Sequence, residues 1–226
     1  MKLLFVLVLC INLIFAYQPS GLLNSVPTNK KIVFLTFDDG PLPEVTNQLL
    51  DILASENVKA TFFLIGNNII KYPDLVEKIY LAGHEIGNHS YNHIRLDNLF
   101  GDNLRFEIEE TNNLIKDILG FKPRFFRPPG GRFNNIVYEA VRNNNLISLG
   151  WVINASDYLD DNRRVMSEIE IDSKLRQIMS NLHGNLKPGA VILMHNGNKL
   201  SVRAVQRVIK YVHDSGYQFK KLSDYL

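Results

Sequence analysis

The feature that most constrains the fold of this chain is a regular alternation of two kinds of segment. Short apolar runs, rich in β-branched and aromatic residues and bounded by turn residues, are typical of buried strands. The longer segments between them repeat apolar residues at the spacing of an amphipathic helix. The predicted strands are 32–37, 60–65, 84–88, 124–127, 146–153, 190–194 and 217–222, and the predicted helices are 45–55, 73–82, 102–119, 134–143, 168–182 and 201–215. The pair at 66–67, Gly-Asn, is predicted to be an ordinary turn.

Strand–helix alternation within one domain implies a mainly parallel sheet of the α/β class. About seven such units indicate an open or distorted (β/α) barrel, similar to a TIM barrel. The 226 residues are enough for one domain of this kind with a substantial core. No internal repeat or low-complexity linker divides the chain, so we predict a single domain over residues 30–226, preceded by a polar lead-in at 17–29. Folds of this kind hold their active sites at the carboxyl ends of the strands.

The N-terminus has the features of a secretory signal peptide. Lys2 is followed by an apolar run at 3–16 that only Asn12 interrupts, and the run ends at the small residue Ala16. We expect cleavage near Ala16, a secreted protein that can associate with the cell wall, and no stable membrane anchor. An uncleaved anchor stays open, although the run is short for a membrane span. The only cysteine, Cys10, lies in this segment, so the mature chain would have no disulfide.

The first predicted strand runs directly into two acids, Asp38 and Asp39, which a Gly-Pro pair follows. Neighbouring side chains on an extended chain point in different directions. One carboxylate can therefore bind a metal ion while the other stays free to act as a base. Taken alone, the stretch is explained equally well as a solvated turn, because Asp-Gly is common turn chemistry. The formal charge of +2 is too small to indicate a nucleic-acid partner.

His89 and His93 follow the third predicted strand and stand four residues apart. On a helical turn this spacing puts two imidazoles on one face, where both can bind one metal ion. With Asp39 they would supply two nitrogens and one carboxylate oxygen. That is the donor set of a catalytic zinc site, with a coordination position left for water. His84, in contrast, is expected to be a structural histidine.

Three later strand ends also present polar side chains. Arg127 is the only charge in a loop rich in proline and glycine, where it can orient a carboxylate or simply lie at the surface. Asp157 is a candidate partner for an arginine or a histidine. His195 ends a buried strand, as a general acid, a metal ligand or a buried structural histidine would. Trp151, the only tryptophan, is most often a core residue in such a position.

These segments, in this order, resemble the five motifs of the polysaccharide deacetylase family, the NodB homology domain of carbohydrate esterase family 4. The resemblance spans roughly residues 30–226 and implies a distorted (β/α) barrel of about seven strands. The matching segments are 36–40 (TFDDG), 89–93 (HSYNH), 127–131 (RPPGG), 151–158 (WVINASDY) and 193–195 (LMH).

By position, the resemblance implies a role for each polar residue of the motifs. Asp38 would be the general base and His195 the general acid, and Arg127 and Asp157 would be supporting charges. One divalent metal ion is implied, with Zn²⁺ expected and Co²⁺ as an alternative. Its ligands would be Asp39, His89 and His93.

Four further residues stand at motif positions that serve the oxyanion or the substrate: Gly130, Trp151, Tyr158 and Leu193. The family usually has an aromatic residue where Gly130 stands, and tryptophan where Tyr158 stands. The first of these residues contributes its backbone N–H to the oxyanion site. Glycine keeps that N–H, but it removes an aromatic wall of the groove and some rigidity.

The expected activity is hydrolysis of the N-acetyl groups of a polysaccharide that contains N-acetylglucosamine, with release of acetate. Chitin or its oligosaccharides are the expected substrate, and peptidoglycan N-acetylglucosamine is the alternative. Two other functions stay open: a wall-polysaccharide-binding relic without turnover, and an amidohydrolase for a small amide that is not a sugar. The intact catalytic and ligand residues argue against the relic, and the secretion signal favours a polymer.

Overall fold

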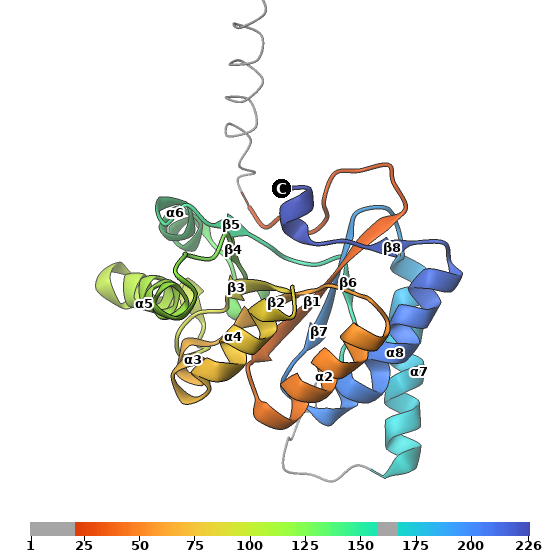
Figure 1. Cartoon of the computed structure of the whole chain (residues 1–226). Coiled ribbons are helices and arrows are strands. Elements are labelled where there is room, and N and C mark those ends of the chain that lie inside the picture. Colours follow the sequence, from red (N-terminus) through yellow and green to blue (C-terminus); the bar gives the residue numbers. More distant parts are fainter. Residues whose placement is uncertain (1–20, 158–166) are drawn as a thin grey trace, which may run out of the picture.

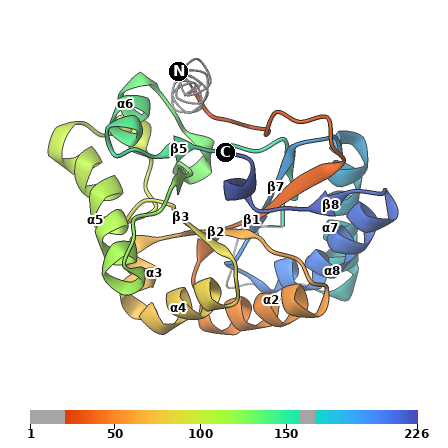
Figure 2. The same ribbon diagram turned by 45° about the horizontal axis from the view of Figure 1, so that its top comes forward.

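The computed structural model describes residues 21–157 and 167–226 (Figure 1). Its strands form one sheet in the order β5-β4-β3-β2-β1-β7-β6, with β8 beside β1, and these strands pair in parallel. The sheet curves into a half-barrel, and helices from α5 through α4, α2 and α8 to α7 lie in an arc outside it (Figure 2). This arrangement confirms the predicted α/β fold with a distorted (β/α) barrel.

The elements of the described residues are bounded as follows. The strands are β1 (Ile32–Gly40), β2 (Thr61–Leu64), β3 (Glu85–Asn88), β4 (Phe125–Phe126), β5 (Ile147–Ser148), β6 (Ile153–Asn154), β7 (Ala190–His195) and β8 (Gln218–Phe219). The helices are α2 (Pro43–Ser55), α3 (Gly66–Lys71), α4 (Pro73–Leu81), α5 (Gly101–Leu119), α6 (Asn135–Asn143), α7 (Glu168–Asn185) and α8 (Lys199–Asp214). Short 3₁₀ turns are η1 (Leu96–Asn98), η2 (Pro129–Gly131) and η3 (Leu222–Asp224).

The central strand β1 is buried on both faces, which explains its nearly continuous apolar sequence. Its odd-numbered residues from Val33 to Phe37 pack into the outer core, beneath helices such as α2 and α8. Phe34 instead belongs to a second cluster on the concave side of the sheet. Because side chains alternate along a strand, Thr36 and Asp38 continue the concave column toward the carboxyl edge. The sequence pattern of β1 therefore sets which of its polar residues can reach the centre of the half-barrel.

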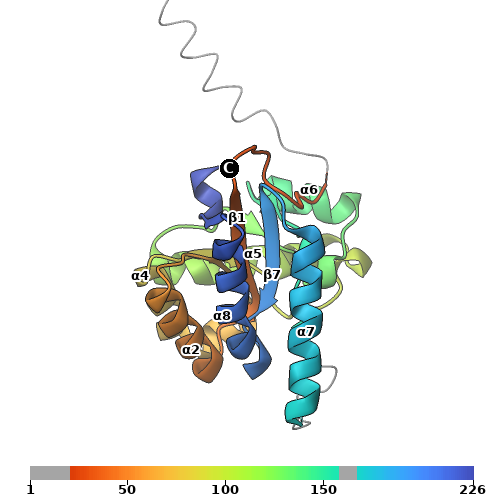
Figure 3. The same ribbon diagram turned by 90° about the vertical axis from the view of Figure 1, so that its right-hand side faces the viewer.

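Local sequence signals explain several helix ends. Ser167 and Glu170 form a capping box at the start of α7, and the Asn198 side chain accepts from two backbone N–H groups at the start of α8. Helix α5 ends where Gly120 adopts a left-handed conformation, as glycine does readily. In Figure 3, α7 and α8 run roughly along β7, which is seen between them. These helices fix the outer frame, so the carboxyl ends of the strands are left to build the site.

Two sequence predictions of elements are wrong in part. The predicted strand 146–153 is two short strands, β5 and β6, which lie at opposite ends of the sheet order. Between them Gly150 carries the chain across, and a side chain there would collide with Asn24. The pair at 66–67, predicted to be an ordinary turn, begins helix α3. Contacts far away in sequence hold that helix, which local turn signals do not reveal.

The lead-in packs against the sheet in its described part. Leu23 forms a bridge with Leu149, Ser25 forms a bridge with Ala190, and Val26 is buried. The predicted signal peptide at 1–16 and the site candidate Tyr158 lie outside the described residues, so both stay predictions. Within residues 21–157 and 167–226, no helix is long and apolar enough to cross a membrane.

Candidate functional site

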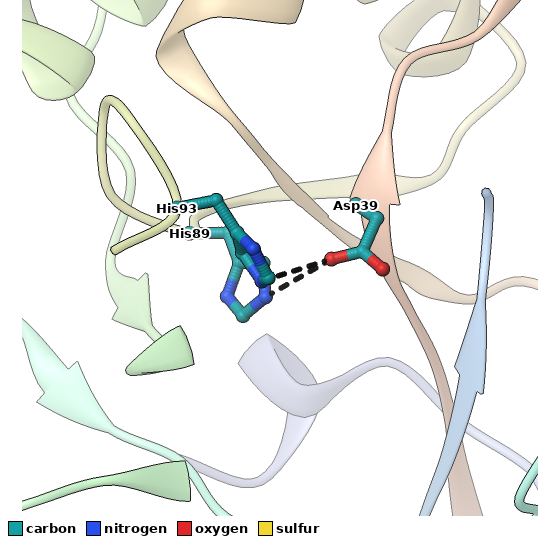
Figure 4. Close-up of side chains that lie close together, drawn as sticks. All are labelled: Asp39, His89 and His93. Atoms are coloured by element: carbon teal, nitrogen blue, oxygen red, sulfur yellow. Dashed lines mark ion pairs between the residues drawn. The ribbon is translucent and has the colours of Figure 1, made fainter. Parts of the chain in front are cut away.

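Three predicted metal ligands meet at the carboxyl edge of the sheet (Figure 4). Asp39 lies near the end of β1, and His89 and His93 lie in the loop after β3. Oδ1 of Asp39 lies 3.4 Å from Nε2 of His89 and 3.2 Å from Nε2 of His93. One ligand atom from each residue falls within 4.8 Å of the other two, so the three can hold one metal ion. The His93 side chain is 40% exposed, which leaves this side of the pocket open to water and substrate.

The backbone around this pocket has an unusual conformation. Within the described ranges, six non-glycine residues have positive φ, and three of them build the pocket: Asp39 at 75°, Ser90 at 64° and His93 at 57°. The interpretation of 89–93 as a helical turn is therefore wrong, because a loop brings the two imidazoles together. Residues held in left-handed conformations cluster at functional sites, where the surrounding structure compensates the strain. Asn68 is part of that support, since its Nδ2 donates to the carbonyl oxygen of Asp39 at 2.9 Å.

The hydrogen bonds of His89 fit a metal ligand. Its Nδ1 lies 2.8 Å from the carbonyl oxygen of Arg127, which can only accept, so Nδ1 carries the proton. Nε2 is then free to present its lone pair toward Asp39. A ligand histidine commonly has its second ring nitrogen fixed in this way. The donor set of one carboxylate oxygen and two imidazole nitrogens suits zinc and related divalent ions.

The charges of the pocket influence one another strongly. Burial alone would raise the pKa of Asp39, but the hydrogen bond from His89 and the nearby histidines lower it to about 2. For His89, burial favours a lower pKa, but the nearby carboxylates of Asp38 and Asp39 outweigh burial and raise the pKa. The pKa of His93 is lowered, first by burial and then by the charge of His89. Asp39 is therefore ionised at neutral pH, as a metal ligand must be.

Asp38 points away from Asp39 into the concave side, where it meets Arg127. Nη1 of Arg127 donates to Oδ1 of Asp38 at 2.7 Å and to Oγ1 of Thr36 at 2.8 Å. The arginine side chain is fully buried, and its Nη2 donates to the carbonyl oxygen of Gly150 at 2.9 Å. Oδ2 of Asp38 lies 3.6 Å from Nε2 of His89, beside the metal pocket. The sequence left a surface position open for Arg127, but the structure buries it against this carboxylate.

His195 and Asp157 form the second buried pair. Nδ1 of His195 lies 2.7 Å from Oδ1 of Asp157, and the backbone N–H of His195 donates to Oδ2 at 2.9 Å. Burial would lower the pKa of His195, but the hydrogen bond and charge of Asp157, with smaller effects from Asp38 and Asp39, raise it to about 9. The histidine is therefore protonated at neutral pH. His195 is the pairing partner of Asp38 between β7 and β1. Since neighbouring strands lie about 5 Å apart, the backbones of these two residues are adjacent.

The rim of the site contains the remaining described candidates. Gly130 is exposed and has φ 61°. Among the described residues, the atom within 4 Å of where its Cβ would stand is Cγ of Arg132, at 3.8 Å. Trp151 is half-buried beneath Gly131 and lies 5.8 Å from the Arg127 guanidinium, so it supports the loop from within. Leu193 is buried on β7, two residues before His195 and thus on the same face.

Two residues that contact the site were not predicted. Thr36 stands two positions before Asp38, so strand alternation alone could have placed it on the same face. It accepts from Arg127 and donates to the carbonyl oxygen of Ile192 at 2.8 Å. Asn68 had no local signal, because the start of α3 looked like a turn. Its contact with Asp39 spans 29 residues of sequence.

Comparison with known proteins places this geometry in a family. A family model described as polysaccharide deacetylase matches residues 25–147. A peptidoglycan-N-acetylglucosamine deacetylase of Bacillus cereus is 36% identical over 212 residues, which cover 92% of this chain and 71% of that protein. The solved structure of the Bc1960 peptidoglycan N-acetylglucosamine deacetylase superposes with a TM-score of 0.80 at 35% identity and covers 90% of this chain and 91% of that one.

A solved structure of a different kind is equally similar in fold. A CE4 family pseudoenzyme from Bacillus anthracis superposes with a TM-score of 0.80 at 26% identity, covering 92% of this chain and 69% of that chain. Since a deacetylase and a pseudoenzyme match equally well, the fold does not decide whether a member is active. Activity has to be argued from the side chains of the site.

Proposed function

Since this chain belongs to the polysaccharide deacetylase family, we propose that it hydrolyses the N-acetyl group of N-acetylglucosamine in peptidoglycan and releases acetate. The two deacetylases described above are named for peptidoglycan, so they favour this substrate over chitin, which the sequence alone had put first. The proposed reaction hydrolyses the carbon–nitrogen bond of the acetamide, and the products are a free amine on the sugar and acetate.

The observation that carries the proposal is the division of labour between two adjacent carboxylates. Asp39 turns toward the two histidines, and Asp38 turns toward Arg127. A solvated turn would leave both acids exposed, whereas Asp38 is buried here and paired with a buried cation. This is the arrangement that a metal ligand next to a general base requires.

We assign Asp39, His89 and His93 as the residues that would hold one divalent ion, with zinc as the first choice. When bound, such an ion polarises the amide oxygen and lowers the pKa of a nearby water. The chain itself contributes the orientation of the ligands. The carbonyl oxygen of Arg127 fixes the His89 tautomer, so Nε2 faces the pocket.

Asp38 is assigned as the general base that takes the proton of the attacking water. Its Oδ1 is held by Arg127, and its Oδ2 remains directed toward the pocket. The buried arginine thus orients this carboxylate and supplies an opposite charge beside it. As the proton leaves, the water oxygen bonds to the acetyl carbon.

The tetrahedral intermediate then needs an oxyanion donor and an acid. We assign the first role to the backbone N–H of Gly130, on the rim of the site. His195, kept protonated by Asp157, is assigned as the acid that gives its Nε2 proton to the leaving nitrogen. The carbon–nitrogen bond breaks, acetate departs, and the sugar keeps a free amine.

We also infer that the enzyme acts outside the cell. The support is the sequence of the first residues, with Lys2 ahead of the apolar run at 3–16. Peptidoglycan lies outside the membrane, so secretion and the proposed substrate agree. N-terminal sequencing of protein recovered from the medium or wall of an expressing culture would test the expected cleavage near Ala16.

The decisive experiment measures acetate release from peptidoglycan and from chitin oligomers, with and without added Zn²⁺ or Co²⁺. We expect release from peptidoglycan that depends on the metal, and weaker release from chitin oligomers. Faster release from chitin would correct the substrate but keep the chemistry. A metal-loaded protein that binds glycan and releases no acetate from either polymer would favour the binding relic instead.

A further inference from the structure

We propose that Glu107 is a positioning residue for the metal site. Its buried carboxylate would hold the loop between the two histidine ligands in the shape that directs both imidazoles at one ion. This inference rests on the proposed metal site and adds a residue outside every sequence motif of the family resemblance. Glu107 lies on α5, and its residue surface is only 2% exposed.

All side-chain hydrogen bonds recorded for Glu107 go to the loop that connects the ligands. Oε2 accepts from the backbone N–H groups of Tyr91 at 3.0 Å and Asn92 at 2.8 Å. Oε1 accepts from Nδ2 of Asn92 at 2.6 Å. Both oxygens are thus used as acceptors. The loop residues 91–92 stand directly between His89 and His93.

The burial of this acid has no other explanation in the described part of the chain. A buried carboxylate is costly unless hydrogen bonds or a cation compensate it. No lysine, arginine or histidine among the described residues lies within ion-pair distance of Glu107. Among the described residues, the groups that compensate its charge are N–H groups of the loop. The carboxylate and the loop conformation therefore depend on each other.

The loop needs such an anchor because its backbone is strained. Ser90 and His93 both have left-handed φ values, which are unfavourable for residues with a side chain. Local contacts help: Asn88 accepts from the N–H of Ser90, and Oγ of Ser90 accepts from the N–H of His93. These contacts stay within residues 88–93 and cannot fix the loop relative to the rest of the barrel.

Contacts from two helices supply that fixation. At the start of α3, the backbone N–H groups of Gly66 and Asn67 donate to the carbonyl oxygens of Ser90 and Tyr91, both at 3.0 Å. Nδ2 of Asn67 also donates to Oδ1 of the exposed Asn92 side chain at 2.9 Å. α3 thus holds carbonyl oxygens of the loop, whereas the buried side chain of Glu107, on α5, holds two of its backbone N–H groups together with the Asn92 side chain. Without it, those N–H groups would lose their acceptor and the loop could leave its left-handed conformation. His93, the more exposed ligand, would be affected first.

The test measures Co²⁺ binding by Glu107→Gln. A titration gives the Kd, and the visible absorption spectrum reports the surroundings of the bound ion. Glutamine keeps the shape of the side chain, but it places an N–H₂ group where an acceptor is needed. The matched control is Glu109→Gln, which removes the same charge from the same helix about 200° around its axis. Urea unfolding of each metal-free protein measures stability separately.

We expect the Kd for Co²⁺ to rise about tenfold to a hundredfold in Glu107→Gln, with a changed cobalt spectrum, as is typical when a partner of a ligand is lost. Glu109→Gln should match the natural protein. A Glu107→Gln protein that is less stable but keeps both Kd and spectrum would overturn the proposal, since Glu107 would then serve the fold alone.

A second variant keeps the proposal testable if Glu107→Gln does not fold. Asn92→Ala removes the contact with Oε1 and leaves the two backbone N–H contacts, so a smaller rise of a few-fold in Kd is expected. An unchanged Kd in Asn92→Ala would then refute the positioning role. If the natural protein itself binds no Co²⁺, the metal site fails together with this inference, whereas normal binding in all variants refutes only the inference.

Discussion

Replacing Asp157 by asparagine should move the basic limit of catalysis toward neutral pH. Asp157 accepts from Nδ1 and from the backbone N–H of His195, and it is the main cause that holds the pKa of this histidine at about 9. Asparagine can still accept from Nδ1 through its amide oxygen, so the ring stays near its position. The negative charge that favours the imidazolium is lost, and the burial that opposes it remains.

The size of the effect follows from the two pKa values. The difference between about 9 in the folded protein and the ordinary 6.5 corresponds to about 3.4 kcal/mol in favour of the protonated form. At pH 8, His195 would be about 90% protonated in the natural protein and about 3% protonated with an ordinary pKa, which predicts about a thirtyfold loss of rate from protonation alone. Below pH 6 the two proteins should differ much less.

The assay is the pH dependence of kcat on a soluble peptidoglycan fragment at saturating metal, from pH 5 to about pH 10. NMR titration of the His195 ring in the metal-free proteins gives the pKa directly. A basic limb near 9 in both proteins would show that Asp157 does not set the pKa. A basic limb near 6.5 in the natural protein would show that His195 is not the acid that limits the rate.

Four further outcomes test other parts of the site and the fold. His93→Ala should lose most of about one bound ion per chain, whereas the exposed control His213→Ala should keep it, as measured by elemental analysis. Asp38→Asn should keep the metal and lose about a hundredfold or more in kcat, and a near-normal rate would remove its role as base. Gly130→Tyr should lower the free energy of unfolding by about 1 kcal/mol, because the residue has a positive φ. It should raise kcat/KM on oligosaccharides if the aromatic wall is the only part of the substrate groove that glycine removes. Burial, and then nearby lysines, lower the pKa of His84 to about 4. The folded state should therefore lose up to about 3 kcal/mol of stability as pH falls from 6.5 through 4. Urea unfolding at a series of pH values should show a smaller loss for His84→Gln.

Much of the frame could be predicted because it depends on periodic signals. The apolar run of β1 and the run of β7 each end in a polar residue, and parallel topology brings such ends to one edge. Asp38 and His195 are indeed neighbours in the pairing of these two strands. The three ligand candidates meet as the motif spacing indicated. For Asp38, Asp39 and His195 a buried strand fixes the position of the residue at its end, whereas the loop after β3 positions His89 and His93.

What could not be predicted depends on contacts without a local signature. Glu107 sits on an ordinary amphipathic helix, and nothing in its neighbours distinguishes it from Glu109 or Glu110. Its role comes from backbone N–H groups 15 and 16 residues earlier, which every residue type offers alike. The split of 146–153 has a similar cause, since the run is mostly apolar and only the sheet order shows where it breaks.

The left-handed residues of the site follow a rule that only the structure exposes. Where the chemistry needs a side chain at such a position, as at Asp39 and His93, the strain has to be compensated by contacts such as those from Asn68 and Glu107. Where it needs only a backbone N–H, as proposed at residue 130, glycine adopts the same conformation at little cost. From sequence, Gly130 was a missing aromatic residue. In the structure its φ of 61° gives a reason for glycine itself, so this departure from the family pattern is compatible with an active enzyme.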